Sequence, residues 1–98
     1  MTDTARSTAE ASPPPSDLFL YTRPGCHLCD DARKLILELL EERAARGIPT
    51  QRLVERDITT DPEWERAHFT TIPVLELGDR RLGLALSPAK VRRLLDGA

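Results

Sequence analysis

The sequence predicts an α/β domain, a four-stranded mixed sheet flanked by helices, and three observations support this fold class. Short apolar or alternating segments are typical of strands. A longer segment carries an apolar stripe at helical spacing. Asp-Pro and Ser-Pro pairs mark the starts of two further helices. In chain order the elements are β-α-β-α-β-β-α, and a length of 98 residues fits one domain.

The first strand and the longest helix are predicted on either side of a short Pro-Gly turn. Residues 18–22, LFLYT, are apolar and aromatic enough for a buried strand. Apolar residues then recur at steps of three and four across residues 28–40, as one face of a helix requires. Asp30 and Lys34 are spaced as an i,i+4 ion pair, and Gly47 ends the helix.

A second strand and a short helix are predicted next. Residues 53–58, LVERDI, have the composition of a strand. Asp61-Pro62 supplies an N-cap and a first helical position. In this helix we expect Trp64 and Ala67 to face the core and His68 to lie on the surface.

Two strands and a final helix complete the predicted domain. Strands at 74–77 and 81–86 flank a turn at 78–80, whose glycine favours a hairpin. Ser87-Pro88 repeats the N-cap and first-position pattern. The last helix then carries an apolar stripe of Val91, Leu94 and Leu95.

The N-terminal segment differs in composition from the rest of the chain. Residues 1–16, MTDTARSTAEASPPPS, contain no aromatic residue and no Leu, Ile or Val. Such a segment cannot bury enough apolar area to offset the entropy of ordering it. We therefore expect a disordered N-terminal tail over residues 1–16 and a folded domain over residues 17–98.

Charge and hydropathy argue against several classes of partner. The net charge is −2 with both signs interspersed, and no basic block or aromatic–basic ladder suggests nucleic-acid binding. No apolar run approaches the ~18 residues of a membrane span. The N-terminus lacks the apolar segment of a secretory signal. We expect a cytoplasmic monomer, in a compartment where thiols are kept reduced.

The two cysteines, Cys26 and Cys29, carry the clearest chemical signal. They form a C-x-x-C motif where the first predicted strand and turn meet the long helix. A helix N-terminus offers unpaired N–H groups and a partial positive charge, and both favour the Cys26 thiolate. Cys29, one turn later, is placed to attack a mixed disulfide on Cys26. The alternative to a redox role is that the two cysteines simply pack in the core as small apolar residues.

Residues around this motif resemble a known family. The segment YTRPGCHLCDDA, with Thr71-Ile72-Pro73-Val74 further on, is similar to the glutaredoxin branch of the thioredoxin superfamily. More narrowly, it resembles small bacterial glutaredoxin-like proteins with a TRPGCxLC signature. The resemblance spans about residues 18–96. It implies a thioredoxin-like fold and a thiol–disulfide oxidoreductase with Cys26 as the nucleophile and Cys29 as the resolving thiol.

The resemblance also implies a binding surface for substrate. Pro73 matches the family's cis-proline beside the active site. The backbone of Ile72 is then expected to pair with an extended substrate or with glutathione. Arg23 stands where glutaredoxins usually have a lysine that meets the glycine carboxylate of glutathione, and arginine can bind it bidentately.

One departure from the family concerns glutathione. Glutaredoxins usually carry I-G-G-x-D-D after the last strand, whereas residues 82–87 here read LGLALS. The second glycine and both aspartates are missing. Only Ser87 and the N–H groups of the last helix remain to hold the α-carboxylate. Glutathione is thus a possible co-substrate that we expect to bind weakly, and no bound cofactor is expected.

Two neighbours are expected to tune Cys26. A protonated His27 would favour the thiolate and raise the reduction potential. Asp30, four residues after Cys26, would oppose a second negative charge on the same helix face. The expected partners are a disulfide-containing protein or a low-molecular-weight thiol, and a reductant system.

Two other functions remain open on the sequence alone. The C-x-x-C pair could serve a metal or iron–sulfur binding module, although such sites usually need four ligands, so a dimer or external thiols would have to complete them. The chain could also be a redox-inert interaction domain, because a fold does not fix a function. The retained cysteine pair argues against that last possibility.

Overall fold

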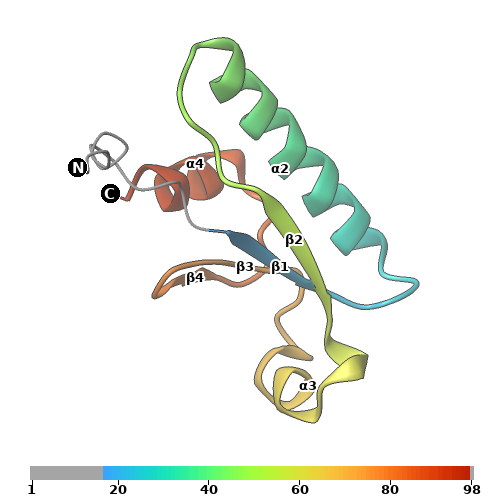
Figure 1. Cartoon of the computed structure of the whole chain (residues 1–98). Coiled ribbons are helices and arrows are strands. Elements are labelled where there is room, and N and C mark those ends of the chain that lie inside the picture. The colour runs from blue at the N-terminus through green and yellow to red at the C-terminus, as the bar shows by residue number, and fades with distance from the viewer. Residues whose placement is uncertain (1–16, 98) are drawn as a thin grey trace, which may run out of the picture.

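A computed structural model describes residues 17–97 and shows one four-stranded mixed sheet between helices (Figure 1). The strand order is β2-β1-β3-β4. Strand β1 (Leu18–Thr22) runs parallel to β2 (Leu53–Asp57) and antiparallel to β3 (Val74–Leu77). Strand β3 pairs antiparallel with β4 (Arg80–Leu82). The predicted fold class is confirmed, and the predicted tail at 1–16 lies outside the described residues.

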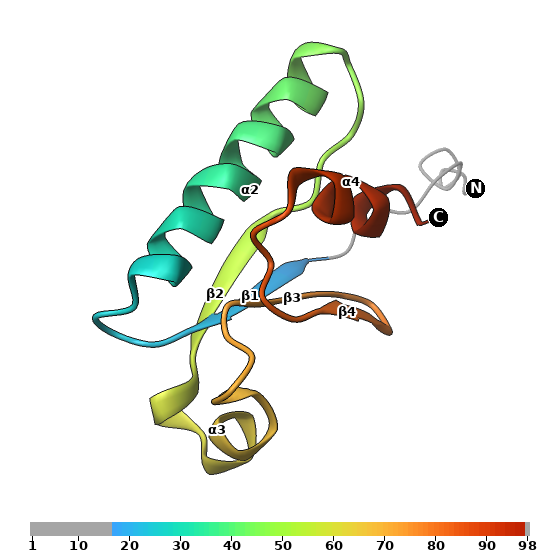
Figure 2. The ribbon, with the colours of Figure 1, turned by 180° about the vertical axis from the view of Figure 1, so that it is seen from behind.

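Two helices cover one face of the sheet. Helix α2 (His27–Ala45) and helix α4 (Pro88–Asp96) lie on the same side of the sheet (Figures 1 and 2). They pack on alternate residues of β1 and β3, and this is the larger core of the domain. Its buried residues are Leu18, Leu20, Ala32, Ile36, Leu39, Leu40, Leu75, Leu77, Ala85, Val91, Leu94 and Leu95.

The opposite face carries a smaller core under a short helix. A 3-10 turn, η1 (Ile58–Thr60), ends β2 one residue earlier than the sequence predicts, because Asp57 caps it by accepting a hydrogen bond from the Thr59 N–H. Helix α3 (Pro62–His68) follows, with Asp61 as N-cap and proline in its first turn, as predicted. Tyr21, Ile58 and Val74 form this core, with Phe19, Trp64 and Ile72 packed against it.

The inward face of α3 differs from the prediction. Trp64 is half-buried as expected, but Ala67 is exposed and His68 is buried. Trp64 and His68 are four residues apart and share a helix face, and the His68 ring packs on Tyr21 with ring centroids 4.3 Å apart. Treating His68 as a polar surface residue was therefore wrong, and so was placing Ala67 on the inward face.

The last strand is also shorter than predicted. Strand β4 ends at Leu82, not at residue 86, because Leu84 adopts a left-handed conformation with φ 48°. The chain then leaves the ladder: the Leu84 N–H donates to Thr71 O at 2.9 Å and the Ala85 N–H to Pro73 O at 2.8 Å. These bonds tie Leu84 and Ala85 to the residues just before β3.

The helix boundaries agree with their local signals. Gly47, with φ 78°, follows the α2 C-cap, and Ser87 caps α4 by accepting from the Lys90 N–H at 3.3 Å. Within residues 17–97 no helix combines the length and apolar character that crossing a membrane requires.

Candidate functional site

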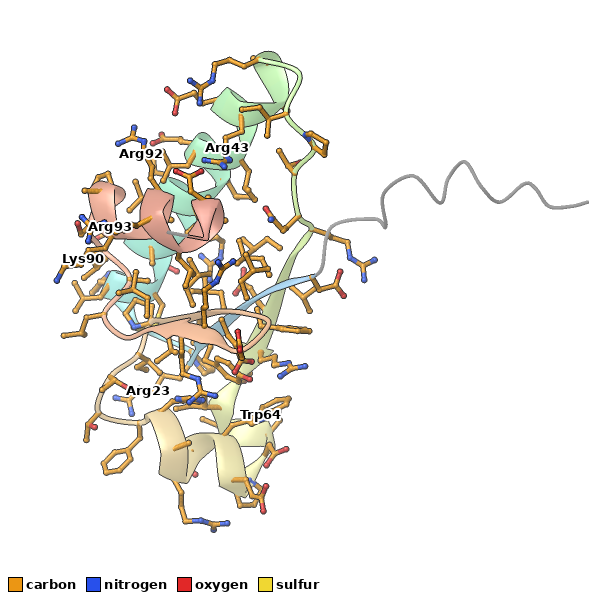
Figure 3. The ribbon with its side chains drawn as sticks, turned by 90° about the vertical axis from the view of Figure 1, so that its left-hand side faces the viewer. Arg23, Arg43, Trp64, Lys90, Arg92 and Arg93 are labelled. Carbon is orange, nitrogen blue, oxygen red and sulfur yellow. A yellow bond between two sulfur atoms is a disulfide. The ribbon has the colours of Figure 1, made fainter. Side chains whose placement is uncertain are left out.

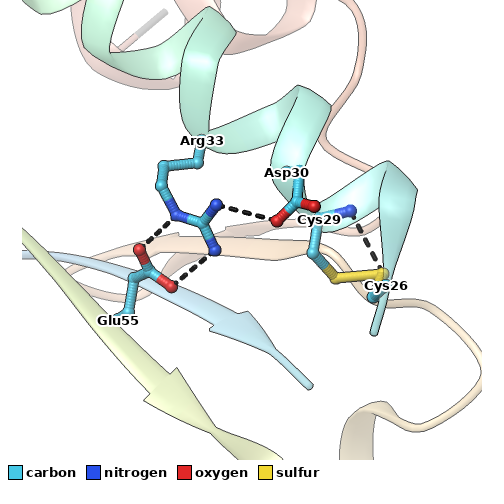
Figure 4. The surroundings of a disulfide bond; sticks show 5 residues. All are labelled: Cys26, Cys29, Asp30, Arg33 and Glu55. Carbon is cyan, nitrogen blue, oxygen red and sulfur yellow. Dashed lines mark hydrogen bonds and ion pairs between the residues drawn. A yellow bond between two sulfur atoms is a disulfide. The ribbon is translucent and has the colours of Figure 1, made fainter. Parts of the chain in front are cut away.

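The cysteine pair lies where a turn delivers the chain from β1 into α2. Gly25, with φ 75°, takes a backbone conformation that other residues adopt only at a cost. Cys26 is the N-cap of α2, and its Sγ accepts a hydrogen bond from the Cys29 N–H at 3.1 Å (Figure 4). The two cysteines form a disulfide, with their Cα atoms 5.2 Å apart. The motif is therefore arranged for reversible S–S bond formation within one helical turn.

The two cysteines differ in how far solvent reaches them. Cys29 is fully buried, with an exposed fraction of 0%. Cys26 is partly exposed, and the residues between the two, His27 and Leu28, are exposed. A reagent in solution therefore approaches this site from the Cys26 side.

The start of β3 lies at the same end of the sheet as this turn. Tyr21 pairs with Val74, so the end of β1 that leads to the cysteines lies beside Pro73. Pro73 is buried, and the Ile72–Pro73 peptide bond is cis. The side chain of Ile72 packs against the smaller core. The sheet thus brings the cysteine turn together with Ile72 and Pro73.

The backbone N–H of Ile72 is already engaged. It donates to the carbonyl oxygen of His68 at 3.1 Å, and the Thr71 N–H donates to the same oxygen at 2.9 Å. In the predicted pairing with an extended substrate, the Ile72 carbonyl oxygen would accept a hydrogen bond from the substrate. The Ile72 N–H could donate to the substrate only if its bond to His68 at the end of α3 opened.

Three backbone donors of the segment 83–87 are engaged within the domain. The N–H groups of Leu84 and Ala85 are bonded to the Thr71 and Pro73 carbonyls, and the Leu86 N–H donates to Leu84 O at 2.7 Å. The hydroxyl of Ser87 caps α4. Every one of these groups already has a partner inside the domain.

Arg23 is exposed in the turn before the cysteines. Within residues 17–97 it forms no ion pair, so its guanidinium can meet an anion from solution. Figure 3 shows Arg23 apart from Lys90, Arg92 and Arg93, the basic residues of α4. Arg23 is thus a separate cationic position near the cysteine turn.

Asp30 has a different partner from the one its spacing suggests. Its carboxylate pairs with Arg33 at 2.9 Å, and Arg33 also binds Glu55 of β2 (Figure 4). The expected Asp30–Lys34 pair is therefore wrong, because the tertiary position of Glu55 draws in Arg33. The hydrogen bonds that Arg33 donates to Glu55, and then the one to Asp30, raise the pKa of Arg33, so its guanidinium stays charged.

Metal ligands do not gather around the cysteines. Among the residues that the structure describes, no group of three or more His, Cys, Asp or Glu side chains is placed to hold one ion. Any metal or cluster would need ligands from outside this part of the chain.

Comparison with known proteins places this geometry in a family. A family model described as "Glutaredoxin-like domain (DUF836)" matches residues 17–96. The chain belongs to this glutaredoxin-like family. The match covers the strands, the helices and the cysteine turn described above, and it confirms the predicted family resemblance.

Two known proteins illustrate the relationship. A "Glutaredoxin-like protein YDR286C homolog" of Dictyostelium discoideum is 34% identical over 53 residues, which is 54% of this chain and 45% of that protein. The chain thus matches less than half the length of that relative. The X-ray structure of target protein XcR50 from X. campestris is 30% identical, with a TM-score of 0.64, and the match covers 83% of this chain and 97% of that one. This likeness supports the thioredoxin-like fold.

A partly buried polar network in this glutaredoxin-like domain was not predicted from the sequence. The Tyr21 hydroxyl donates to Glu76 Oε1 at 2.9 Å and accepts from Arg56 Nη1 at 2.7 Å. The Arg56 guanidinium also stacks on Phe19, 3.6 Å from the ring centroid. The alternation of side chains along residues 53–57 could have indicated this network, because it places Arg56 beside Tyr21 on the face of the sheet that α3 covers.

Charges in this network shift its titrations. Burial, together with the hydrogen bond to Glu76, raises the pKa of Tyr21. Burial would raise the pKa of Glu76, but hydrogen bonds from Arg81 and Tyr21 outweigh it and lower that pKa. Burial, and then the charge of Arg81, lowers the pKa of His68 despite the opposing charge of Glu76. The network therefore holds a neutral tyrosine, a carboxylate and a neutral histidine at pH 7.

Proposed function

We propose that the protein is a dithiol thiol–disulfide oxidoreductase, with Cys26 as the nucleophile and Cys29 as the resolving thiol. The observation that carries this proposal is the unequal exposure of the pair: Cys29 is fully buried and Cys26 is partly exposed. A substrate disulfide therefore meets the Cys26 sulfur first. The helix N-terminus at Cys26 supplies N–H groups and a partial positive charge that favour its thiolate.

The reaction runs in two exchanges. The Cys26 thiolate attacks one sulfur of the substrate disulfide, which forms a mixed disulfide and releases the other substrate sulfur as a thiolate. Cys29 then gives up its proton, which the released substrate thiolate takes up, and attacks the Cys26 sulfur. This second step forms the Cys26–Cys29 disulfide, releases the reduced substrate and moves two electrons from the protein to the substrate. A thiol reductant, glutathione or a dithiol protein, resets the pair by the reverse exchanges.

Protein disulfides fit this site better than glutathione does. Three backbone donors of residues 83–87, the N–H groups of Leu84, Ala85 and Leu86, are engaged inside the domain, and the Ser87 hydroxyl oxygen already accepts from the Lys90 N–H, so little of this segment is left to bind a γ-glutamyl carboxylate. Arg23 remains as a cation for one end of a peptide substrate or for the glycine carboxylate. We further propose that the protein carries out this reaction as a monomer in the cytoplasm.

Trapping the mixed disulfide tests the order of the two cysteines. Cys29→Ser should accumulate a mixed disulfide on Cys26 when it is mixed with a disulfide-bonded peptide. Cys26→Ser, the matched variant with one remaining thiol, should trap little because Cys29 is buried. Mass spectrometry locates the adduct. An adduct on Cys29 in Cys26→Ser, with none in the converse variant, reverses the assignment.

A second assay addresses the thiol donor. Turnover is measured in parallel with glutathione and glutathione reductase, and with a thioredoxin–thioredoxin reductase system. We expect weak glutathione-dependent turnover, which Leu84→Gly combined with Leu86→Asp should increase if that variant folds. Wild-type turnover equal to that of an ordinary glutaredoxin in the glutathione assay would contradict weak glutathione binding.

A further inference from the structure

Arg33 lies on α2 two turns beyond Cys26 and holds two carboxylates at once. Its Nε and Nη2 donate to the two oxygens of Glu55, with Nη2 2.9 Å from Oε1, and its Nη1 donates to Asp30 Oδ1 at 2.9 Å (Figure 4). Two parallel hydrogen bonds to one carboxylate fix the plane of the guanidinium. Because Glu55 belongs to β2, this arrangement anchors the first turns of the cysteine-bearing helix to the edge of the sheet.

Asp30 is the carboxylate best placed to disturb Cys26. The Asp30 N–H donates to the Cys26 carbonyl oxygen at 3.1 Å, so the two residues are separated by one regular helical turn. Side chains at this spacing are neighbours, with about 5–6 Å between Cβ atoms. A carboxylate free to swing toward the sulfur would oppose a second negative charge there.

We propose that Arg33 is a positioning residue for the thiol chemistry, because it holds the Asp30 carboxylate away from the Cys26 sulfur and cancels its charge. Glu55 is the anchor that keeps Arg33 in place. The inference deepens the proposed function, since it matters for catalysis only if the Cys26 thiolate is the nucleophile.

The other charged groups near Cys26 are the same in all the variants that test this proposal. Arg23 precedes Cys26 in the turn and His27 follows it, and both favour the thiolate when they are cationic. Asp31 is five residues away and so faces another side of the helix. The adjoining segments 69–73 and 83–87 contain no charged side chain. Asp57 ends β2 opposite Thr22, but its carboxylate already accepts from the Thr59 N–H and hydroxyl. Asp30 is thus the acidic group near Cys26 whose charge has to be held.

The test compares four variants in a Cys29→Ser background, in which Cys26 is the remaining thiol. They are the parent, Arg33→Met, Asp30→Asn and the double variant. The readout is the midpoint of the pH dependence of Cys26 alkylation by iodoacetamide. Arg33→Met should raise this midpoint by about half a pH unit, the size expected for a partly exposed charge pair. Asp30→Asn should lower the alkylation midpoint more in the Arg33→Met variant than in the parent. The midpoint of the double variant should therefore return close to that of the parent.

Lys34→Met is the matched control for charge. It removes the same charge one residue along the helix, and Lys34 pairs with no carboxylate within residues 17–97. Its alkylation midpoint should stay near that of the parent. Arg33→Lys, which keeps the charge without the bidentate bond, should fall between the parent and Arg33→Met. Arg33→Gln replaces Arg33→Met if circular dichroism shows that the latter does not fold.

Two outcomes would overturn the inference. Equal shifts in Arg33→Met and Lys34→Met would reduce the effect to net charge. An equal effect of Asp30→Asn with and without Arg33 would show that Arg33 does not hold Asp30. Failure of the proposed function appears elsewhere, as the absence of a trapped mixed disulfide, and it leaves this alkylation comparison interpretable.

Discussion

The hydroxyl of Tyr21 offers a measurable test of the partly buried network on the α3 face. Tyr21→Phe removes only the hydroxyl and keeps the ring that packs on His68 and Trp64. Tyr21 is 3% exposed, and its oxygen bonds to two groups that carry charge, Glu76 at 2.9 Å and Arg56 at 2.7 Å. The substitution therefore removes one hydrogen bond from a charged acceptor, Glu76, and one from a charged donor, Arg56.

The size of the effect follows from these contacts. A hydrogen bond to a charged group contributes about 1.5–3 kcal/mol to stability. Both partners reach other groups, since Glu76 also accepts from Arg81 at 3.0 Å and Arg56 stacks on Phe19, so the loss is smaller than two full bonds. We expect Tyr21→Phe to lower the free energy of unfolding by about 1–2 kcal/mol. This is less than the sum of the two hydrogen bonds, because Glu76 and Arg56 keep their other contacts.

Urea unfolding followed by circular dichroism measures this loss. With an m-value of about 1–2 kcal/mol/M for a small domain, the unfolding midpoint should fall by about 1 M at unchanged slope. In an Arg56→Met background the same substitution should cost less, because one of the two hydrogen bonds is already gone. A loss below about 0.3 kcal/mol would refute the reasoning, since it would lie far below the range for hydrogen bonds to charged groups.

Three further predictions concern stability. Ile36→Ala deletes a fully buried side chain of the larger core and should cost about 2–5 kcal/mol in urea unfolding, whereas Leu37→Ala, at a side chain 48% exposed, should cost far less. The pKa of His68 is lowered in the fold, so its contribution to stability is present above about pH 6.5 and is lost as the pH falls below that value; unfolding measured from pH 7 to 5 should show this slope in the wild type and a flatter one in His68→Leu. Leu84 has φ 48°, so Leu84→Gly should be more stable than Leu84→Ala by about 1 kcal/mol in thermal or urea unfolding, and the reverse order would contradict a left-handed residue at this position.

Elements with local signals could be predicted from the sequence. Gly47, Asp61-Pro62 and Ser87-Pro88 mark helix ends by their own backbone and side-chain chemistry, and the structure has these ends at the expected positions. The end of β4 could not be predicted in the same way. Leu84 is held in a left-handed conformation where its segment bonds to Thr71 and Pro73, residues more than ten positions away. No pattern within residues 81–86 contains that information.

The candidate site shows the same division between local and distant causes. The motif of Cys26 and Cys29 could be recognised because a turn, an N-cap and a helix start are consecutive in the chain. The buried position of His68 could not, because it depends on a ring in β1 that lies 47 residues earlier in the sequence. The roles of Arg23, Ile72 and Ser87 stay predictions, although the hydrogen bonds of Ile72 and Ser87 now limit how each can meet a substrate.

The partner of Asp30 shows why helix spacing alone gave the wrong answer. The i,i+3 and i,i+4 positions, Arg33 and Lys34, are both cationic, and spacing rules rate such pairs within a few tenths of a kcal/mol of each other. Glu55, which adds a bidentate bond to one of the two, decides between them. That choice depends on the register of β2 against β1, which pairs Glu55 with Leu20 and so turns its side chain toward α2. Glu55 at the sheet edge therefore determines that Arg33, and not Lys34, pairs with Asp30. Through Asp30, Glu55 influences the electrostatic environment of Cys26.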